Sequence, residues 1–194
     1  MKRFTMTMPQ VTLSYPKTDE ILTTYKNVIG RDYDGYRNHV TRMLNFCHYL
    51  LPTISDEDSQ KLQIAAAFHD IALWTHDRVD YLVPSYEECN RYLVANNLSH
   101  WQEEVQIIID MHHLMSVYQG PFEHLTEIFR KADLIDFSLG LVANGVDRAF
   151  IKQVKQAIPN AGFHLCLMRF TFKQLGRNPL NPVPMMRRKN IYRD

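Results

Sequence analysis

Four polar residues occupy positions where the helical pattern of the sequence would otherwise place carbon. His39 borders the apolar stripe of one predicted helix, and His69 and Asp70 directly follow the apolar run AAAF. Asp133 lies on the margin of a third apolar face. A buried carboxylate has to lose its charge or find a cation. Two imidazoles and two carboxylates from three helices suit a divalent metal ion, which accepts histidine nitrogen and carboxylate oxygen together.

The consecutive placement of His69 and Asp70 restricts how they share an ion. Neighbouring residues of an α-helix point about 100° apart. Both side chains therefore reach one cation only if it lies beside the helix, between the two directions. A lone histidine or aspartate in such a position is more often a structural residue or a helix cap. The prediction of a metal site therefore depends on the four residues together.

The order of these residues resembles the HD superfamily of metal-dependent phosphohydrolases, in which a histidine, a histidine–aspartate pair and a final aspartate follow one another. The stretches NHVTRML, AAAFHDIA and RKADLIDFSLG look like the helices that carry this motif, and the resemblance covers about residues 33–140. It implies an all-α HD-domain bundle and a metal ion held by His39, His69, Asp70 and Asp133. Asp136, one turn beyond the last of these, is the rival carboxylate.

Further residues are candidates for roles beside the metal. His112 falls on the inward stripe of its predicted helix, and some HD proteins use histidines of this region for a second metal, so His112 is expected to contact either a metal or the substrate. Arg42 follows His39 on the same side of the helix and is expected to bind phosphate. Asp70 and Asp77 are the predicted catalytic carboxylates. Asp77 is the candidate general acid because IALW occupies the place after the HD pair where several HD nucleotidases carry an acidic residue.

Helical periodicity predicts the elements that must position these residues. The predicted helices cover residues 18–29, 33–51, 56–73, 84–97, 101–114, 125–139, 147–158 and 161–176. Pro52 ends the second helix, and Ser55 precedes three acidic residues suited to the start of the third. Residues 75–83 are expected to form a loop. No stretch with the alternation of a β-strand is evident, so the predicted fold class is all-α.

The chain is expected to form one domain over residues 1–177, followed by a tail at residues 178–194. The tail contains three prolines and is expected to extend outside the helical core. Residues 148–194 carry 10 basic side chains and one acidic side chain, whereas the preceding residues carry 12 and 20. A basic tail can meet a polyanion. The basic cluster at residues 187–189 is short, with only Tyr192 nearby for stacking, so no specific nucleic-acid binding is expected.

The composition is that of an ordinary soluble protein, with 194 residues of which 45% are hydrophobic and 22% charged. The three cysteines are an odd number and lie in apolar segments, which indicates reduced thiols in a cytoplasmic protein. No signal peptide and no transmembrane helix are predicted. A cytoplasmic location without a membrane partner is therefore expected.

The resemblance implies a function for the predicted site. The protein is expected to hydrolyse a nucleotide or another small phosphate ester by means of a metal-activated water. The ion is expected to be Mn, Fe, Co, Ni, Zn or Mg, and the mixed ligand set favours a transition metal. Two alternatives stay open. One is a non-catalytic nucleotide-binding or regulatory module, and the other is a di-iron oxygenase, which the shortage of inward histidines disfavours. The oligomeric state is left open.

Overall fold

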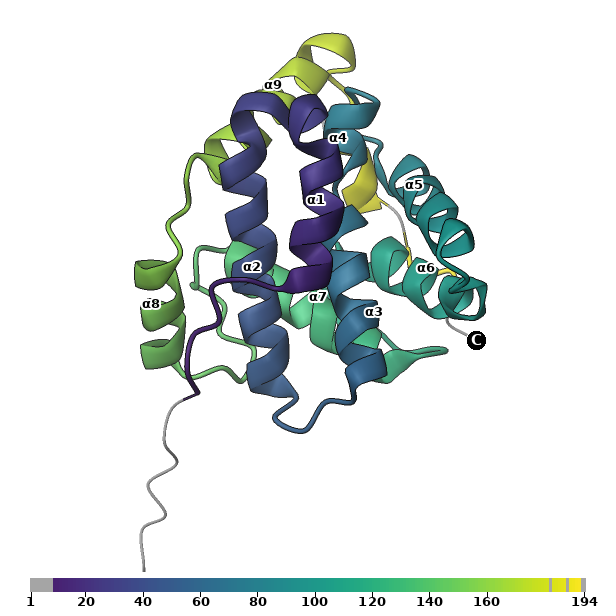
Figure 1. The fold of residues 1–194 in the computed structure, drawn as a ribbon. Helices are drawn as coiled ribbons and strands as arrows, with labels where there is room; N and C mark the ends of the chain where they lie inside the picture. The colour runs from purple at the N-terminus through teal and green to yellow at the C-terminus, as the bar shows by residue number, and fades with distance from the viewer. Residues whose placement is uncertain (1–8, 182, 188, 193–194) are drawn as a thin grey trace, which may run out of the picture.

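The protein is a bundle of α-helices in which one helix is surrounded by several others (Figure 1). The computed structural model describes residues 9–181, 183–187 and 189–192. The N-terminal stretch examined for a leader, and the side chains of Arg187 and Arg188 in the basic cluster, lie outside the described residues. None of the described residues forms a β-strand, which confirms the predicted all-α class.

Short loops join the helices in the order shown in Figure 1. The α-helices are α1 (Pro16–Ile29), α2 (Tyr33–Leu50), α3 (Asp56–Phe68), α4 (Ala72–Thr75), α5 (Leu82–Ala95), α6 (Gln102–Met111), α7 (Glu123–Phe137), α8 (Arg148–Ala157) and α9 (Phe163–Arg177). The 3-10 helices are η1 (Gly30–Asp32), η2 (Ser99–Trp101) and η3 (Pro184–Arg187). Within the described ranges, none of the helices combines the length and the apolar character that crossing a membrane requires.

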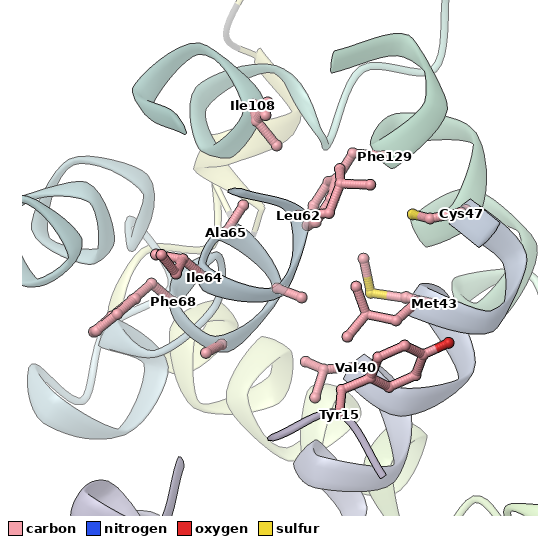
Figure 2. Packing of buried hydrophobic residues seen from close by; sticks show 14 of the residues in the cluster. Tyr15, Val40, Met43, Cys47, Leu62, Ile64, Ala65, Phe68, Ile108 and Phe129 are labelled. Carbon is pink, nitrogen blue, oxygen red and sulfur yellow. The ribbon is translucent and has the colours of Figure 1, made fainter. Parts of the chain in front are cut away.

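Helix α3 is the central element, and its sequence explains why. Its residues from Lys61 to Phe68 are all buried, as expected of a helix that is apolar on every side. The alanines at positions 65–67 leave room for α1, α2 and α6 to pack around it. Figure 2 shows Leu62 on the side of α3 that faces α2 and α7, whereas Phe68 lies on another side. At its start, Ser55 Oγ accepts a hydrogen bond from a backbone N–H, which confirms the predicted cap.

The third predicted helix does not continue to residue 73; α3 ends at Phe68, and the HD pair lies in the turn that follows. Tyr36 of α2 explains this difference. Its hydroxyl donates to the backbone oxygen of Ala67 at 3.1 Å and accepts from the backbone N–H of Asp70 at 3.3 Å. These bonds replace helical partners, and two i→i+3 hydrogen bonds then lead the chain into α4.

The prediction of a tail outside the helical core is wrong for the described part of the tail. Met185 packs against an apolar cluster formed by α4, α9 and the loop before α5. Asn190 donates a hydrogen bond to the backbone oxygen of Gln119 at 2.8 Å, and the Tyr192 hydroxyl donates to Asp110 of α6 at 3.2 Å. Prolines prevent the tail from forming a long helix, but its apolar side chains still gain free energy by burial.

A buried ion pair fastens the segment between α6 and α7 (residues 112–122) to α7. Glu127 accepts hydrogen bonds from Arg130 Nε and Nη2, both at 2.7 Å, and from the backbone N–H of Tyr118 at 2.9 Å. Arg130 also donates to the backbone oxygen of Leu114 at 3.0 Å. Burial raises the pKa of Glu127, but the bonds from Arg130 and Tyr118 outweigh burial and lower this pKa below its usual value of 4.5.

Replacing Glu127 with alanine is predicted to lower the free energy of unfolding by about 3 kcal/mol, because the buried Arg130 loses its counter-ion. The control is Glu87→Ala at an exposed position of α5, which should change stability by less than about 0.5 kcal/mol. Denaturant unfolding at neutral pH measures both variants, and equal stability would contradict the prediction. The contribution of Glu127 is present above about pH 4.5 and is lost as the pH falls through its lower folded-state pKa, so the difference should shrink in acid.

Candidate metal centre

Three side chains bring their ligand atoms close enough together to share one metal ion. The Nε2 atoms of His39 and His69 lie 3.2 Å apart, and a carboxylate oxygen of Asp70 lies 3.3 Å from Nε2 of His69. Across the described residues, these three form a group whose ligand atoms all lie within 4.8 Å of one another. Two nitrogens bound to one metal at about 2.1 Å lie about 3.0 to 3.4 Å apart in octahedral or tetrahedral geometry. The observed separation therefore fits a shared cation.

The hydrogen bonds of the two histidines show which ring nitrogens are available. Nδ1 of His39 donates to Asp136 at 2.8 Å, and Nδ1 of His69 donates to the backbone oxygen of Ala66 at 2.9 Å. With the protons on Nδ1, both Nε2 atoms carry lone pairs that face each other. Oδ1 of Asp70 is also buried, without a hydrogen-bond partner among the described residues. Three acceptors that converge without a donor fit a cation site.

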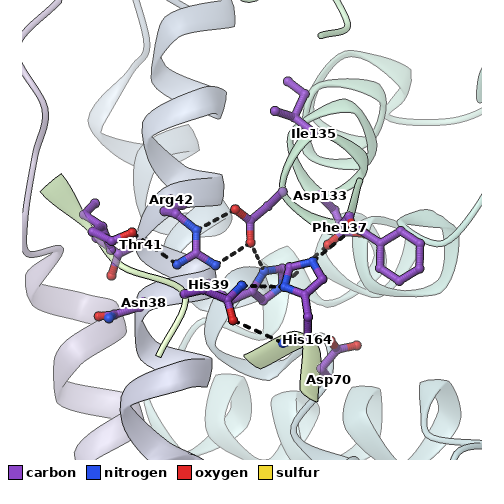
Figure 3. A network of polar contacts seen from close by, with 12 residues as sticks. Asn38, His39, Thr41, Arg42, Asp70, Asp133, Ile135, Phe137 and His164 are labelled. Atoms are coloured by element: carbon purple, nitrogen blue, oxygen red, sulfur yellow. Dashed lines mark hydrogen bonds and ion pairs between the residues drawn. The ribbon is translucent and has the colours of Figure 1, made fainter. Parts of the chain in front are cut away.

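Asp136 orients His39 from the side of the ring that faces away from this group. Its carboxylate accepts hydrogen bonds from Arg42 Nε at 2.6 Å, from Arg42 Nη2 at 2.7 Å and from His39 Nδ1 (Figure 3). Burial raises the pKa of Asp136, but the bonds from Arg42 and His39 outweigh burial and lower it to about 2. The carboxylate therefore stays ionised and keeps the proton of His39 on Nδ1.

The prediction that Arg42 binds phosphate is wrong. Its guanidinium is buried, and the nitrogen that does not contact Asp136 donates to the backbone oxygen of Pro159 at 2.9 Å. Figure 3 shows Arg42 and His39 projecting from α2 toward the helix that carries Asp133. The one-turn spacing of His39 and Arg42 does bring them together, but around a structural carboxylate rather than around a substrate.

Asp133 lies at the edge of the group. One of its carboxylate oxygens is 3.5 Å from Nε2 of His39, which is the nitrogen that faces the site. Asp136, the rival carboxylate, contacts the opposite nitrogen of the same ring. Burial raises the pKa of Asp133. Its position suits the fourth ligand that the family pattern implies, and its ligation stays a prediction.

His112 lies directly against the candidate ligands. Its Nδ1 donates to the backbone oxygen of Ile109 at 2.6 Å, so Nε2 is again the available nitrogen. This atom lies 3.6 Å from Oδ1 of Asp70 and 3.4 Å from the hydroxyl of Tyr81. The structure therefore brings His112 to the site, where the sequence predicts a contact with metal or substrate.

Asp77 does not belong to the site, so its predicted catalytic role is wrong. Its side chain is 52% exposed and forms ion pairs with Lys173 and Arg177 of α9. It is also absent from the lining of the cavity that contains His39 and Asp70. The short helix α4 carries the chain away from the HD pair before Asp77 is reached.

Three aromatic residues complete the site. The ring of Phe163 stacks on His39 with centroids 3.9 Å apart and an angle of 12° between the planes. Tyr36 holds the turn of the HD pair, and Tyr81 contacts His112. Only Tyr36, one turn before His39, has a spacing that would have indicated its role. Phe163 comes from a distant segment, and no local pattern identifies it.

The candidate ligands line part of a cavity of about 140 Å³. Its polar lining includes His39, Asp70, His112, His113 and Asp133. Apolar side chains from the loop before α5, from α7, from α9 and from the C-terminal tail line the rest. A metal ion bound by these ligands would therefore lie in the wall of a small, mostly apolar chamber.

Comparison with known proteins agrees with this geometry. The family model of the HD domain matches residues 36–138, which is more than half of the chain and includes all four residues of the predicted metal quartet. No curated protein and no solved structure matches the chain at a significant level. The helical fold, the convergence of His39, His69 and Asp70, and the family match lead to one conclusion. The chain belongs to the HD-domain family.

Proposed function

We propose that this protein is a metal-dependent phosphohydrolase that cleaves a nucleotide or another small phosphate ester. The observation that carries the proposal is the convergence of His39, His69 and Asp70, as acceptors without a donor, beside a cavity that His39 and Asp70 line. A divalent ion at this position, chosen among Mn, Fe, Co, Ni, Zn and Mg, would supply a Lewis acid that activates water and stabilises charge on the phosphoryl group.

Individual residues of the chain would hold the ion, orient its ligands and position the substrate. Asp70 and Asp133 supply negative charge to hold the cation, and Asp136 keeps Nε2 of His39 turned toward it. Phe163 covers one face of the His39 ring and excludes water from that side. His112 presents the lone pair of Nε2 in the cavity wall, where it can accept a hydrogen bond from a water molecule or from a phosphate hydroxyl and so orient the ester.

The cellular setting is part of the proposal. Cys47, Cys89 and Cys166 are all free thiols and all buried. Burial raises the pKa of each thiol, so none of them is a reactive nucleophile at neutral pH. Unpaired cysteines support a reducing compartment, and we propose that the enzyme acts on a phosphorylated metabolite in the cytoplasm.

The first prediction concerns metal affinity. Asp70→Asn should weaken binding of Zn²⁺ or Mn²⁺ at least about 100-fold, because the amide cannot replace the charge of the carboxylate. Calorimetric titration of metal-free protein measures the affinity. The matched control is Asp77→Asn, which changes an aspartate outside the cavity and should bind metal like the wild type. Asp133→Asn tests the fourth ligand in the same way, and unchanged affinity in both Asp70→Asn and Asp133→Asn would refute the metal centre.

The second prediction concerns turnover. The metal-loaded protein should release phosphate from phosphate esters, and a chelator should abolish this activity, which added Mn²⁺ or Zn²⁺ should restore. Asp133→Asn should lower kcat about 100-fold or more. Phosphate release over a panel of nucleotides, sugar phosphates and simple esters provides the measurement. Binding of nucleotides without turnover of any ester would instead support the regulatory alternative.

The third prediction separates two roles for His112. If His112 contacts the substrate, His112→Ala should keep the metal-to-protein ratio of the wild type and should lower kcat/KM about 10- to 100-fold. Elemental analysis gives the ratio, and steady-state kinetics gives kcat/KM. A lower metal content in this variant would show that His112 is a metal ligand.

A further inference from the structure

The cavity beside the candidate metal ligands has largely apolar walls. Helix α9 contributes Phe163, Leu167 and Phe170, and the C-terminal tail contributes Val183 and Met185. Phe170, Leu167 and Met185 belong to one apolar cluster with the short helix α4 and the loop that follows it. A ligand that fills this part of the cavity gains free energy by burying apolar surface.

The described lining of the cavity also lacks cationic side chains. No lysine or arginine of the described residues contributes to its lining. Two cations of the surrounding helices have other partners, since Arg42 pairs with Asp136 and Arg169 pairs with Asp32. Each phosphate that does not contact the metal would therefore enter an apolar wall without a counter-ion, which is costly.

The expected charge of the metal centre also disfavours ligands with more than one phosphate group. If His39, His69, Asp70 and Asp133 hold one divalent ion, the two carboxylates would balance its charge, because the neutral histidines add none. Such a centre would have no excess positive charge to attract a polyphosphate. A ligand with one phosphate group places that group at the metal and leaves the apolar walls to the rest of the molecule.

The size of the cavity limits the apolar part of the ligand. Its volume of about 140 Å³ is close to that of an apolar protein cavity of about 150 Å³ that accepts one benzene ring. The phosphate shares this space with the rest of the ligand, so the apolar part is at most a single ring or a short alkyl chain. A nucleoside, with both a base and a ribose, would extend beyond this volume.

We propose that the substrate is an aryl or short alkyl phosphate ester, with one phosphate group at the metal and an apolar group of about one ring against α9 and the tail. This inference rests on the proposed function, because it specifies the substrate class of the same site. It narrows the candidate substrates from phosphate esters in general to those whose alcohol is apolar.

Calorimetric titration with two phosphonates that are not hydrolysed tests the proposal without using activity. Phenylphosphonate should bind zinc-loaded protein about 10- to 100-fold more tightly than methylphosphonate, because only the former carries a ring to bury. Leu167→Ser, in the cavity wall, should reduce this advantage about 5-fold or more. The matched control is Leu165→Ser on the same helix, whose side chain is 69% exposed and does not line the cavity. It should bind both phosphonates as the wild type does.

The outcomes separate this inference from the proposed function. Equal affinity for the two phosphonates, or an advantage that Leu167→Ser leaves unchanged, would overturn the substrate class even if the protein hydrolyses other esters. The expected binding pattern in a protein that hydrolyses neither phenyl phosphate nor glycerol 3-phosphate would support the pocket assignment and refute the hydrolase. Thermal unfolding verifies that the variants fold, and the wild-type comparison of the two phosphonates is decisive without them.

Discussion

The carboxylate of Asp136 is buried between α2 and α7, where it accepts two hydrogen bonds from Arg42 and one from His39. Removing such a carboxylate from water costs several kcal/mol, and only a well-placed cation with additional hydrogen bonds offsets that cost. The constraint extends further because Arg42 also donates to the backbone oxygen of Pro159, just before α9. One ion pair therefore fixes the ring of His39, the helix that carries Asp133, and the start of the helix that forms the apolar wall.

The second constraint is the hydroxyl of Tyr36, which ends α3 at the HD pair. By bonding to Ala67 and Asp70 it takes the place of helical hydrogen bonds and turns the chain into α4. In a continuous helix His69 and Asp70 would point about 100° apart. An oxygen of Asp70 lies 3.3 Å from Nε2 of His69, so that both can reach one cation between these two directions. Both constraints involve side chains of α2, which also carries His39.

The site combines the charged candidate metal ligands with apolar surroundings. The candidate ligands open into a cavity whose other walls come from α7, α9 and the tail. Electrostatic interactions are stronger in such a place than in water because fewer water dipoles screen them. The same walls admit only ligands that leave little charge away from the metal. Metal chemistry and substrate choice thus depend on different parts of the fold, the first on α2, α3 and α7 and the second on α9 and the tail.

Local patterns in the sequence determined the all-α class, the approximate bounds of most helices and the residues that converge at the site. Apolar spacing, a proline and a cap are sufficient for the helices, because each acts within a few residues. His39, His69, Asp70, Asp133 and His112 were identifiable because a polar residue on a core face needs a partner.

Only the tertiary structure decided the remaining features. Arg42 binds Asp136 instead of a phosphate, Asp77 lies in surface ion pairs, and the tail packs on the bundle. The end of α3 depends on Tyr36, more than 30 residues away in the chain. Each of these outcomes depends on which groups from distant segments meet after the core has formed. Hydrogen bonds and ion pairs act over a few ångströms in space, and no local sequence pattern records that proximity.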